Sequence, residues 1–461
     1  MTSDVPLQLR QITRARFDAF AGYCRRPLAS KFAVEMAWLE EVRGDVFATL
    51  IVDTDGLYSG VVFARDLQER FRCVKCTNSH ESCKDARSEL EALVASALED
   101  LDEARVQGDE AAKPTDFFAP RVDETKQHPN FRLLASDPSH EPARRLIEEM
   151  MRWYEDRDGN FIQQFQTEGF DARIWELYLW ATLVSLDLEA KFPKPSPDLD
   201  ASGVGVRFAI EATTINPSLR DGVPVAAPKP ESAEEKTEYF RNYLPVRFAG
   251  PLSSKLSKRY WLKKAVAGLP FVIAIQDFHT DFSMTWSGIA LPSYLYGYDL
   301  LEKGDEESEF TRPRAIENHN WGMKTVPSGF FSLPEAENVS AVIFNPSGTL
   351  AKFNRMGLKV GFNSSSASVT HMGRRAVVVG RNYRVTTFRE EVAESYEENW
   401  VDGMNVYHNP NAVHQLDSTW LPGAAHHYFN DGQLVSEVPD RHLFESMTAV
   451  VRFVNADAHR P

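Results

Sequence analysis

Residues 170–186 read FDARIWELYLWATLVSL, and the chain then runs through Pro197-Asp198 into VRFAIEATT at 206–214. Between Arg173 and Asp187 the only charged residue is Glu176. A helix that is apolar all round is normally interior, so the first segment predicts a buried helix. An isolated carboxylate in such surroundings is kept by pairing, by protonation or by binding a cation. Glu176 therefore needs a partner.

The residues after this helix predict a hairpin that carries two more carboxylates. Asp198 opens a short strand, Ser202-Gly203 marks a turn, and residues 206–214 form a second strand rich in β-branched and aromatic residues. Alternation places one set of side chains on one face (Val206, Phe208, Ile210) and a second set on the other (Arg207, Ala209, Glu211, Thr213). Such a hairpin brings Asp198 and Glu211 together over the end of the Glu176 helix. Oxygen ligands of this kind suit Mg²⁺ or Mn²⁺, which polarise a phosphate and generate hydroxide from water.

This arrangement resembles the PD-(D/E)XK nuclease superfamily, also called the restriction-endonuclease-like fold. There a helix-borne Glu precedes a Pro-Asp on one strand and an acid-x-Lys on the next. The resemblance implies a mixed α+β and α/β protein with a central αβββαβ core. It makes Glu176 the helix acid, which binds a second ion or water, and it makes Asp198 the central metal ligand, with Glu211 and the Ala212 carbonyl as further ligands. The lysine of the motif falls on Thr213, whose hydroxyl cannot offset developing negative charge.

A replacement for this lysine is expected downstream, because residues 241–264 hold seven basic residues and no acidic one. Ser253-Ser254 can open a helix that puts Lys255 in its first turn, beside Thr213. Lys255 is the first candidate for the missing cation, and Lys258 is the second. Lys255 and Arg259 share a helical face by their spacing, and Tyr260 and Trp261 offer stacking surfaces for nucleic acid. The substrate backbone is expected along a set of basic residues (Arg247, Lys258, Arg259, Lys263, Lys264).

Composition bounds these expectations. The chain has 461 residues, a net charge of −15, and 66 acidic against 51 basic side chains. This balance argues against unspecific coating of nucleic acid, while a local basic groove remains compatible with it. No apolar run approaches the roughly 20 residues that span a bilayer. Residues 1–26 do not resemble a signal peptide, so we expect a cytoplasmic protein without membrane contact.

Three of the four cysteines cluster with a histidine, as Cys73, Cys76, His80 and Cys83. Cys-x₂-Cys is a normal zinc ligand pair. The spacing to the other two residues is cramped and a second Cys-x₂-Cys is missing, which argues against zinc and favours free surface thiols on a loop. Four histidines near the C-terminus fit no ligand pattern, and we expect them in surface loops (His408, His414, His426, His427).

The chain divides by composition into four parts. Residues 1–105 predict a small α+β domain, 106–130 a polar linker, and 131–280 the nuclease-like core, with 217–238 as an inserted loop. The apolar run 271–275 predicts a central strand of that core. Residues 281–461 predict an aromatic, β-rich C-terminal extension.

The leading hypothesis is a Mg²⁺- or Mn²⁺-dependent endonuclease that hydrolyses DNA phosphodiester bonds. The resemblance associates such proteins with defence against foreign DNA or with DNA repair, and RNA remains open as a substrate. Cutting both strands of a duplex takes two active sites, which favours a homodimer. One alternative is a catalytically degenerate protein that binds nucleic acid or a protein partner on the same fold, since fold does not fix function. Another is a zinc-organised scaffold built on the Cys73 cluster. The wider chain also resembles bacterial proteins that share FDARIWELYL, IEATT and SKLSKRYW, without an assigned function.

Overall fold

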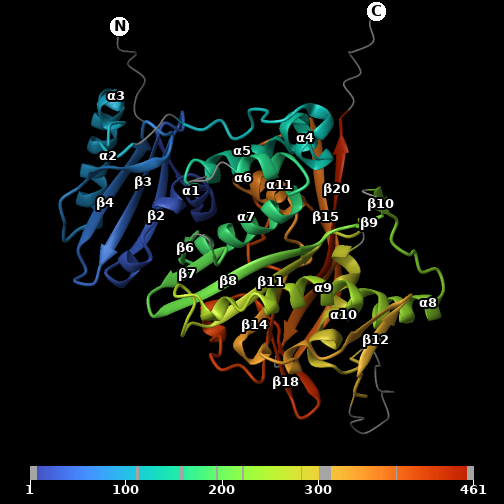
Figure 1. Ribbon diagram of the computed structural model, residues 1–461. Helices are drawn as coiled ribbons and strands as arrows, with labels where there is room; N and C mark the ends of the chain where they lie inside the picture. The colour runs from blue at the N-terminus through green and yellow to red at the C-terminus, as the bar shows by residue number, and fades with distance from the viewer. Residues whose placement is uncertain are drawn as a thin grey trace, which may run out of the picture.

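The computed structural model describes residues 8–110, 114–154, 160–193, 196–220, 223–281, 283–300, 313–364, 366–380 and 382–453. The predicted mixture of helices and sheets is confirmed, and Figure 1 shows how the sheets are arranged. None of the helices in these ranges is both long enough and apolar enough to cross a membrane.

The N-terminal part contains a five-stranded antiparallel sheet in the order β1-β2-β3-β4-β5. Its strands are β1 (Leu9–Ile12), β2 (Ala33–Glu41), β3 (Val46–Asp53), β4 (Tyr58–Arg65) and β5 (Phe71–Cys76). Helix α2 (Cys83–Glu99) covers one face with Leu90 and Val94. Helix α1 (Arg14–Ala21) covers the other face with Phe17 and Phe20, so the sheet is buried on both sides.

Short helices connect this sheet to the rest of the chain. They are α3 (Leu101–Ala104), α4 (Pro129–Ser136), α5 (Glu141–Met151) and α6 (Asn160–Gln166). Helix α5 packs against α11 (Leu350–Lys359) so closely that a Cβ on Gly357 would lie 2.3 Å from the Pro142 carbonyl oxygen. The N-terminal and C-terminal thirds are therefore joined through a tight helix pair.

The central sheet has eight strands in the order β19-β18-β17-β14-β11-β8-β7-β6. Its first half comes from β6 (Glu189–Lys191), β7 (Leu199–Gly203), β8 (Val206–Ile215) and β11 (Phe271–Asp277). Its second half comes from β14 (Ala341–Phe344), β17 (Asn405–His408), β18 (Ala425–Asn430) and β19 (Gln433–Glu437). Strand β11 lies parallel to both β8 and β14. The sheet thus continues across residue 280 into the C-terminal third (Figure 1).

Helices cover both faces of this sheet. Helix α7 (Phe170–Ser185) is buried nearly all round, as its sequence predicts, and packs with Phe208 and Ile210. Helices α9 (Leu244–Ser257) and α10 (Ser283–Tyr296) pack with Ala209 and Ile215 on the opposite face. The predicted alternation along β8 is confirmed by this division. Since Glu211 has the parity of Ala209 and Ile215, its side chain faces α9.

The expected start of α9 at Ser253-Ser254 is wrong, because the helix begins at Leu244 and places Lys255 in its last turn. A buried stripe at four-residue spacing extends the helix upstream (Leu244, Phe248, Leu252, Leu256). Pro245 lies in the first turn, where a missing N–H costs nothing. The helix ends before Arg259, whose φ of 49° is left-handed. Lys255 and Arg259 therefore do not share a helical face, contrary to expectation.

The segment 217–238, expected as an inserted loop, contains regular structure. It holds a two-stranded ribbon of β9 (Ser218–Arg220) and β10 (Val223–Val225), followed by α8 (Ala233–Glu238) with a capping box from Ser232 and Glu235. Residues 221–222 lie outside the described part. A second ribbon pairs β12 (Asn318–Trp321) with β13 (Lys324–Pro327).

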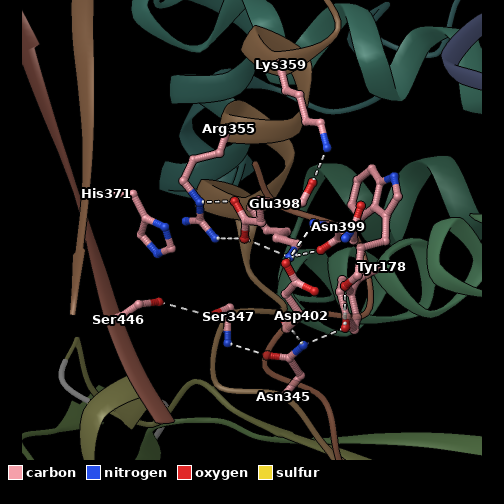
Figure 2. A network of polar contacts seen from close by, with 12 residues as sticks. Tyr178, Asn345, Ser347, Arg355, Lys359, His371, Glu398, Asn399, Asp402 and Ser446 are labelled. Atoms are coloured by element: carbon pink, nitrogen blue, oxygen red, sulfur yellow. Dashed lines mark hydrogen bonds and ion pairs between the residues drawn. The ribbon is translucent and has the colours of Figure 1, made fainter. Parts of the chain in front are cut away.

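A further antiparallel sheet, β16-β15-β20, lies beside the central one (Figure 1). Its strands are β15 (Ala367–Val379), β16 (Asn382–Glu391) and β20 (Leu443–Arg452). Between it and α7 lies a buried polar network, shown in Figure 2, whose centre is the carboxylate of Glu398. That carboxylate accepts hydrogen bonds from Lys352 and Arg355 of α11 at 2.7 and 2.8 Å. The network ties the C-terminal loops to the helices on that side.

Candidate metal centre on strands β7 and β8

Two of the three carboxylates that the sequence singled out, Asp198 and Glu211, meet where β7 begins beside β8. The backbone N–H of Asp198 donates to Oε2 of Glu211 at 3.2 Å, and Oδ2 of Asp198 accepts from the Ala212 N–H at 2.8 Å. Antiparallel pairing of Leu199 with Ile210 sets this register. Each of the two carboxylates therefore accepts a hydrogen bond from the backbone of the segment that carries the other.

Lys255 reaches this pair from α9. Its Nζ lies 3.0 Å from Oε1 of Glu211 and 3.8 Å from Oδ2 of Asp198. Only 3% of Glu211 is exposed, so the ion pair is shielded from solvent. The same ammonium lies 5.8 Å from the centre of the Tyr260 ring. The Lys255 ammonium on α9 thus lies close to both carboxylates.

Glu176 approaches from α7, and its partner is Arg173, one turn earlier on the same helix, at 2.5 Å. Burial and the negative charge of Asp198 raise the pKa of Glu176 to about 7, against the opposing effect of Arg173. Burial and Glu211 raise the pKa of Asp198 as well, while Lys255 opposes the shift. Burial therefore acts on both carboxyls, and the charge of a neighbouring carboxylate adds to its effect in each case.

Thr213 follows two residues after Glu211 and pairs with Ile275 of β11 in the sheet register. It shares the face of β8 that carries Glu211, because the side chains of a strand alternate. Thr213, which occupies the position of the motif lysine, is thus next to the site. The lysine that contacts Glu211 is Lys255 of α9. The Ala212 N–H is engaged by Asp198.

Three of the five basic residues expected along a nucleic acid have partners within the protein, and two are exposed. Arg247 donates to the Ser218 hydroxyl and the Asn216 carbonyl. Arg259 pairs with Glu335 at 2.7 Å. Lys263 donates to the Ser196 hydroxyl, two residues before Asp198, and so borders the site. Lys258 and Lys264 are exposed.

The roles of Tyr260 and Arg173 at the site were not predicted from the sequence. Tyr260 was expected as an exposed stacking surface, but it is 3% exposed and lies beneath the ammonium groups of Lys255 and Lys263. It cannot stack on a base from there. The partner of Glu176 is Arg173, and the signal for it was available in their three-residue spacing on one helix.

Cysteine and histidine clusters elsewhere differ from metal centres. Within the described ranges, no group of three or more His, Cys, Asp or Glu side chains is placed to hold a metal ion, and this applies to Glu176, Asp198 and Glu211 as well as to the cysteine and histidine clusters. His80 pairs with Glu89. The three cysteines are free and exposed, but the expected loop is wrong, because Cys73 and Cys76 lie on β5 and Cys83 begins α2. The expected surface histidines are wrong in three of four cases, since His408, His426 and His427 are buried on β17 and β18. They were misassigned because strand-forming partners far along the chain bury them.

Comparison with known proteins identifies no relative: no family model, no curated protein and no solved structure matches this chain.

Proposed function

We propose that this protein is a metal-dependent nuclease that hydrolyses phosphodiester bonds in DNA at the site formed by Glu176, Asp198, Glu211 and Lys255. The observation that carries the proposal is the position of the Lys255 ammonium, 3.0 and 3.8 Å from the Glu211 and Asp198 carboxylates. The nuclease motif requires a lysine beside two carboxylates. Strand β8 has Thr213 at the position of that lysine, and Lys255 of α9 would take its place.

The order of elements supports the same assignment. Helix α7 is followed by β6, β7 and β8, then, after the β9–β10 ribbon and α8, by α9 and β11; apart from that insertion this is the αβββαβ order that the resemblance implies. Strands β6, β7 and β8 pair antiparallel in sequence, and β11 joins β8 in parallel. The three acids and the lysine lie on α7, on β7 and β8, and on α9, the elements that would carry them in such a core.

The donor set fits Mg²⁺ or Mn²⁺. Burial is the largest cause of the raised pKa values of Glu176 and Asp198, and a neighbouring carboxylate adds to each shift, so a divalent cation bound beside them would oppose both shifts. Mg²⁺ keeps several waters and is usually held by one or two carboxylates together with substrate phosphates, so Asp198 and Glu211 suffice. The Ala212 carbonyl and Glu176 would complete the set. When bound, such an ion polarises the phosphate and lowers the pKa of a coordinated water.

The chain's own residues would then divide the remaining tasks. Lys255 would turn from Glu211 toward the scissile phosphate and stabilise the charge that develops on it. Arg173 would keep Glu176 oriented through their 2.5 Å ion pair. Exposed Lys258 and Lys264 would contact the substrate backbone and make binding salt-sensitive.

Cleavage of plasmid and single-stranded DNA by the purified protein tests this function. We expect cleavage with Mg²⁺ or Mn²⁺ and none with a chelator. Asp198→Asn should abolish it while keeping the fold, because an amide oxygen still accepts the Ala212 N–H. The matched control is Asp200→Asn, two residues along β7, whose carboxylate pairs with Arg207 at the surface and should not matter.

A degenerate protein that binds nucleic acid is the second candidate, and Thr213 in place of the motif lysine is the observation that favours it. It predicts DNA binding by the wild type without cleavage under any divalent ion. Equal cleavage by wild type and Asp198→Asn would contradict both candidates, since the chemistry would then lie elsewhere.

A further inference from the structure

Strand β5 is an edge strand of the N-terminal sheet, and its register against β4 shifts by one residue. Val62 pairs with Lys75 but Phe63 pairs with Cys73, which leaves Val74 as the extra residue of a β-bulge. Both Val74 and Lys75 then face α2: Val74 packs in the cluster that α2 covers, and Lys75 Nζ donates to the Ser96 hydroxyl.

This bulge changes where the two cysteines of the Cys-x₂-Cys point. On a regular strand, residues three apart lie on opposite faces. Because two consecutive residues face α2, Cys73 and Cys76 come together on the other face. Their sulfur atoms are 3.5 Å apart and both residues are exposed.

Among the described residues no third side chain joins the pair as a metal ligand, so the pair stands as a dithiol. His80 bonds to Glu89, and Cys83 lies in the first turn of α2. Cys24 borders the same cavity of about 800 Å³ as Cys73, but its Sγ donates to the Ala21 carbonyl. Closing a bond of about 2.05 Å between Cys73 and Cys76 would take a sulfur movement of roughly 1.5 Å, which side-chain rotation supplies.

We propose that Cys73 and Cys76 are a modification site that forms a reversible intrachain disulfide by exchange with a low-molecular-weight disulfide. The thiolate of one cysteine attacks a sulfur of the small disulfide, forms a mixed disulfide and releases one small thiol. The second cysteine, as thiolate, attacks the protein sulfur of that mixed disulfide and releases the second small thiol. The two cysteines are oxidised by two electrons, the small disulfide is reduced by two, and both protons end on the released thiols.

The test treats the full-length protein with oxidised glutathione, unfolds it in denaturant so that N-ethylmaleimide reaches every remaining thiol, including Cys24, and then measures the intact mass. We expect two of the four cysteines to escape alkylation, with no glutathione retained and full reversal by dithiothreitol. Peptide mapping should find the bond between Cys73 and Cys76. In Cys76→Ser the second step is impossible, so a glutathione adduct should persist on Cys73. The matched control Cys83→Ser, also an exposed cysteine, should still close the bond.

Three results would overturn the proposal: retention of glutathione on Cys73 in the wild type, a bond between Cys73 and Cys24, or a bond between two molecules. None of these readouts requires nuclease activity. The dithiol and the proposed function can therefore fail independently.

Discussion

Replacing the carboxylate at the centre of the buried network in Figure 2 is predicted to be strongly destabilising. Glu398→Gln should lower the free energy of unfolding by about 3–5 kcal/mol, the usual cost of removing one partner of a buried ion pair. The side chains of Lys352, Arg355 and Glu398 are 0%, 2% and 2% exposed, so water cannot replace the lost charge.

The magnitude follows from the number of charged contacts that the carboxylate satisfies. Oε1 accepts from Lys352 at 2.7 Å and from Arg355 at 2.8 Å, and Oε2 accepts from Arg355 at 2.8 Å. Glutamine offers one accepting oxygen and no charge, which leaves two cations facing a neutral amide. The wild-type cations hold the pKa of Glu398 well below its usual value.

This pKa shift fixes the sign of the pH dependence. A carboxyl whose folded pKa is depressed contributes stability above its unfolded pKa, about 4.3, and loses it as the pH falls through the folded pKa. The difference in stability between wild type and Glu398→Gln should therefore be full near neutral pH and shrink in strong acid.

Urea denaturation followed by tryptophan fluorescence measures the effect. The control is Glu397→Gln, the adjacent residue, whose carboxylate is 77% exposed and pairs with Arg441 at 3.4 Å. Its effect should stay within about 0.5 kcal/mol. A loss below about 1 kcal/mol for Glu398→Gln would refute the reasoning, because it would mean that the cations are hydrated or re-paired in the variant.

Three further predictions concern the site, the pH response and the packing. Lys255→Met should lower DNA cleavage by roughly 10²–10³-fold, as the loss of one charge-stabilising donor does, whereas exposed Lys258→Met should mainly weaken DNA binding; equal rates for wild type and Lys255→Met would exclude this lysine. The free energy of unfolding should fall from about pH 7 to about pH 5, because burial lowers the pKa of four histidines in the folded protein, whereas the same histidines bind protons in the unfolded chain (His371, His408, His427, His442). Thermal melts across this pH range check it. Gly357→Ala should destabilise the protein by about 1–3 kcal/mol, because the added Cβ clashes with Pro142. Gly250→Ala should stabilise α9 by up to about 1 kcal/mol, because its Cβ meets nothing within 4 Å. Urea denaturation distinguishes the two signs.

Local patterns in the sequence predicted α7, β7, β8 and β11 between residues 170 and 277, but not the short strand β6. The apolar helix α7, the alternation along β8 and the apolar run of β11 are short-range signals, and each element is present. The residues of β17 and β18 were expected in surface loops, because their place in the same sheet depends on pairing between distant segments. That pairing is also what buries His408 and His427.

The candidate site shows the same limit at the level of side chains. The order of Glu176, Asp198 and Glu211 in the sequence singled them out, and the structure brings them together; their chemistry stays a prediction. The predicted start of α9 was wrong because Ser253-Ser254 was taken as the N-terminal cap, although the buried stripe of the helix begins at Leu244. The burial of Tyr260 depends on contacts with Phe271 of β11 and on neighbouring cations, which its own sequence context does not reveal.

The most direct measurement of the central claim is the anomalous scattering of crystals soaked in Mn²⁺. A single strong peak is predicted between the carboxylates of Asp198 and Glu211, with the Lys255 ammonium displaced from Glu211, and no peak in crystals of Asp198→Asn. Crystals of the wild type that show no peak there, or crystals of the variant that retain it, would contradict the account.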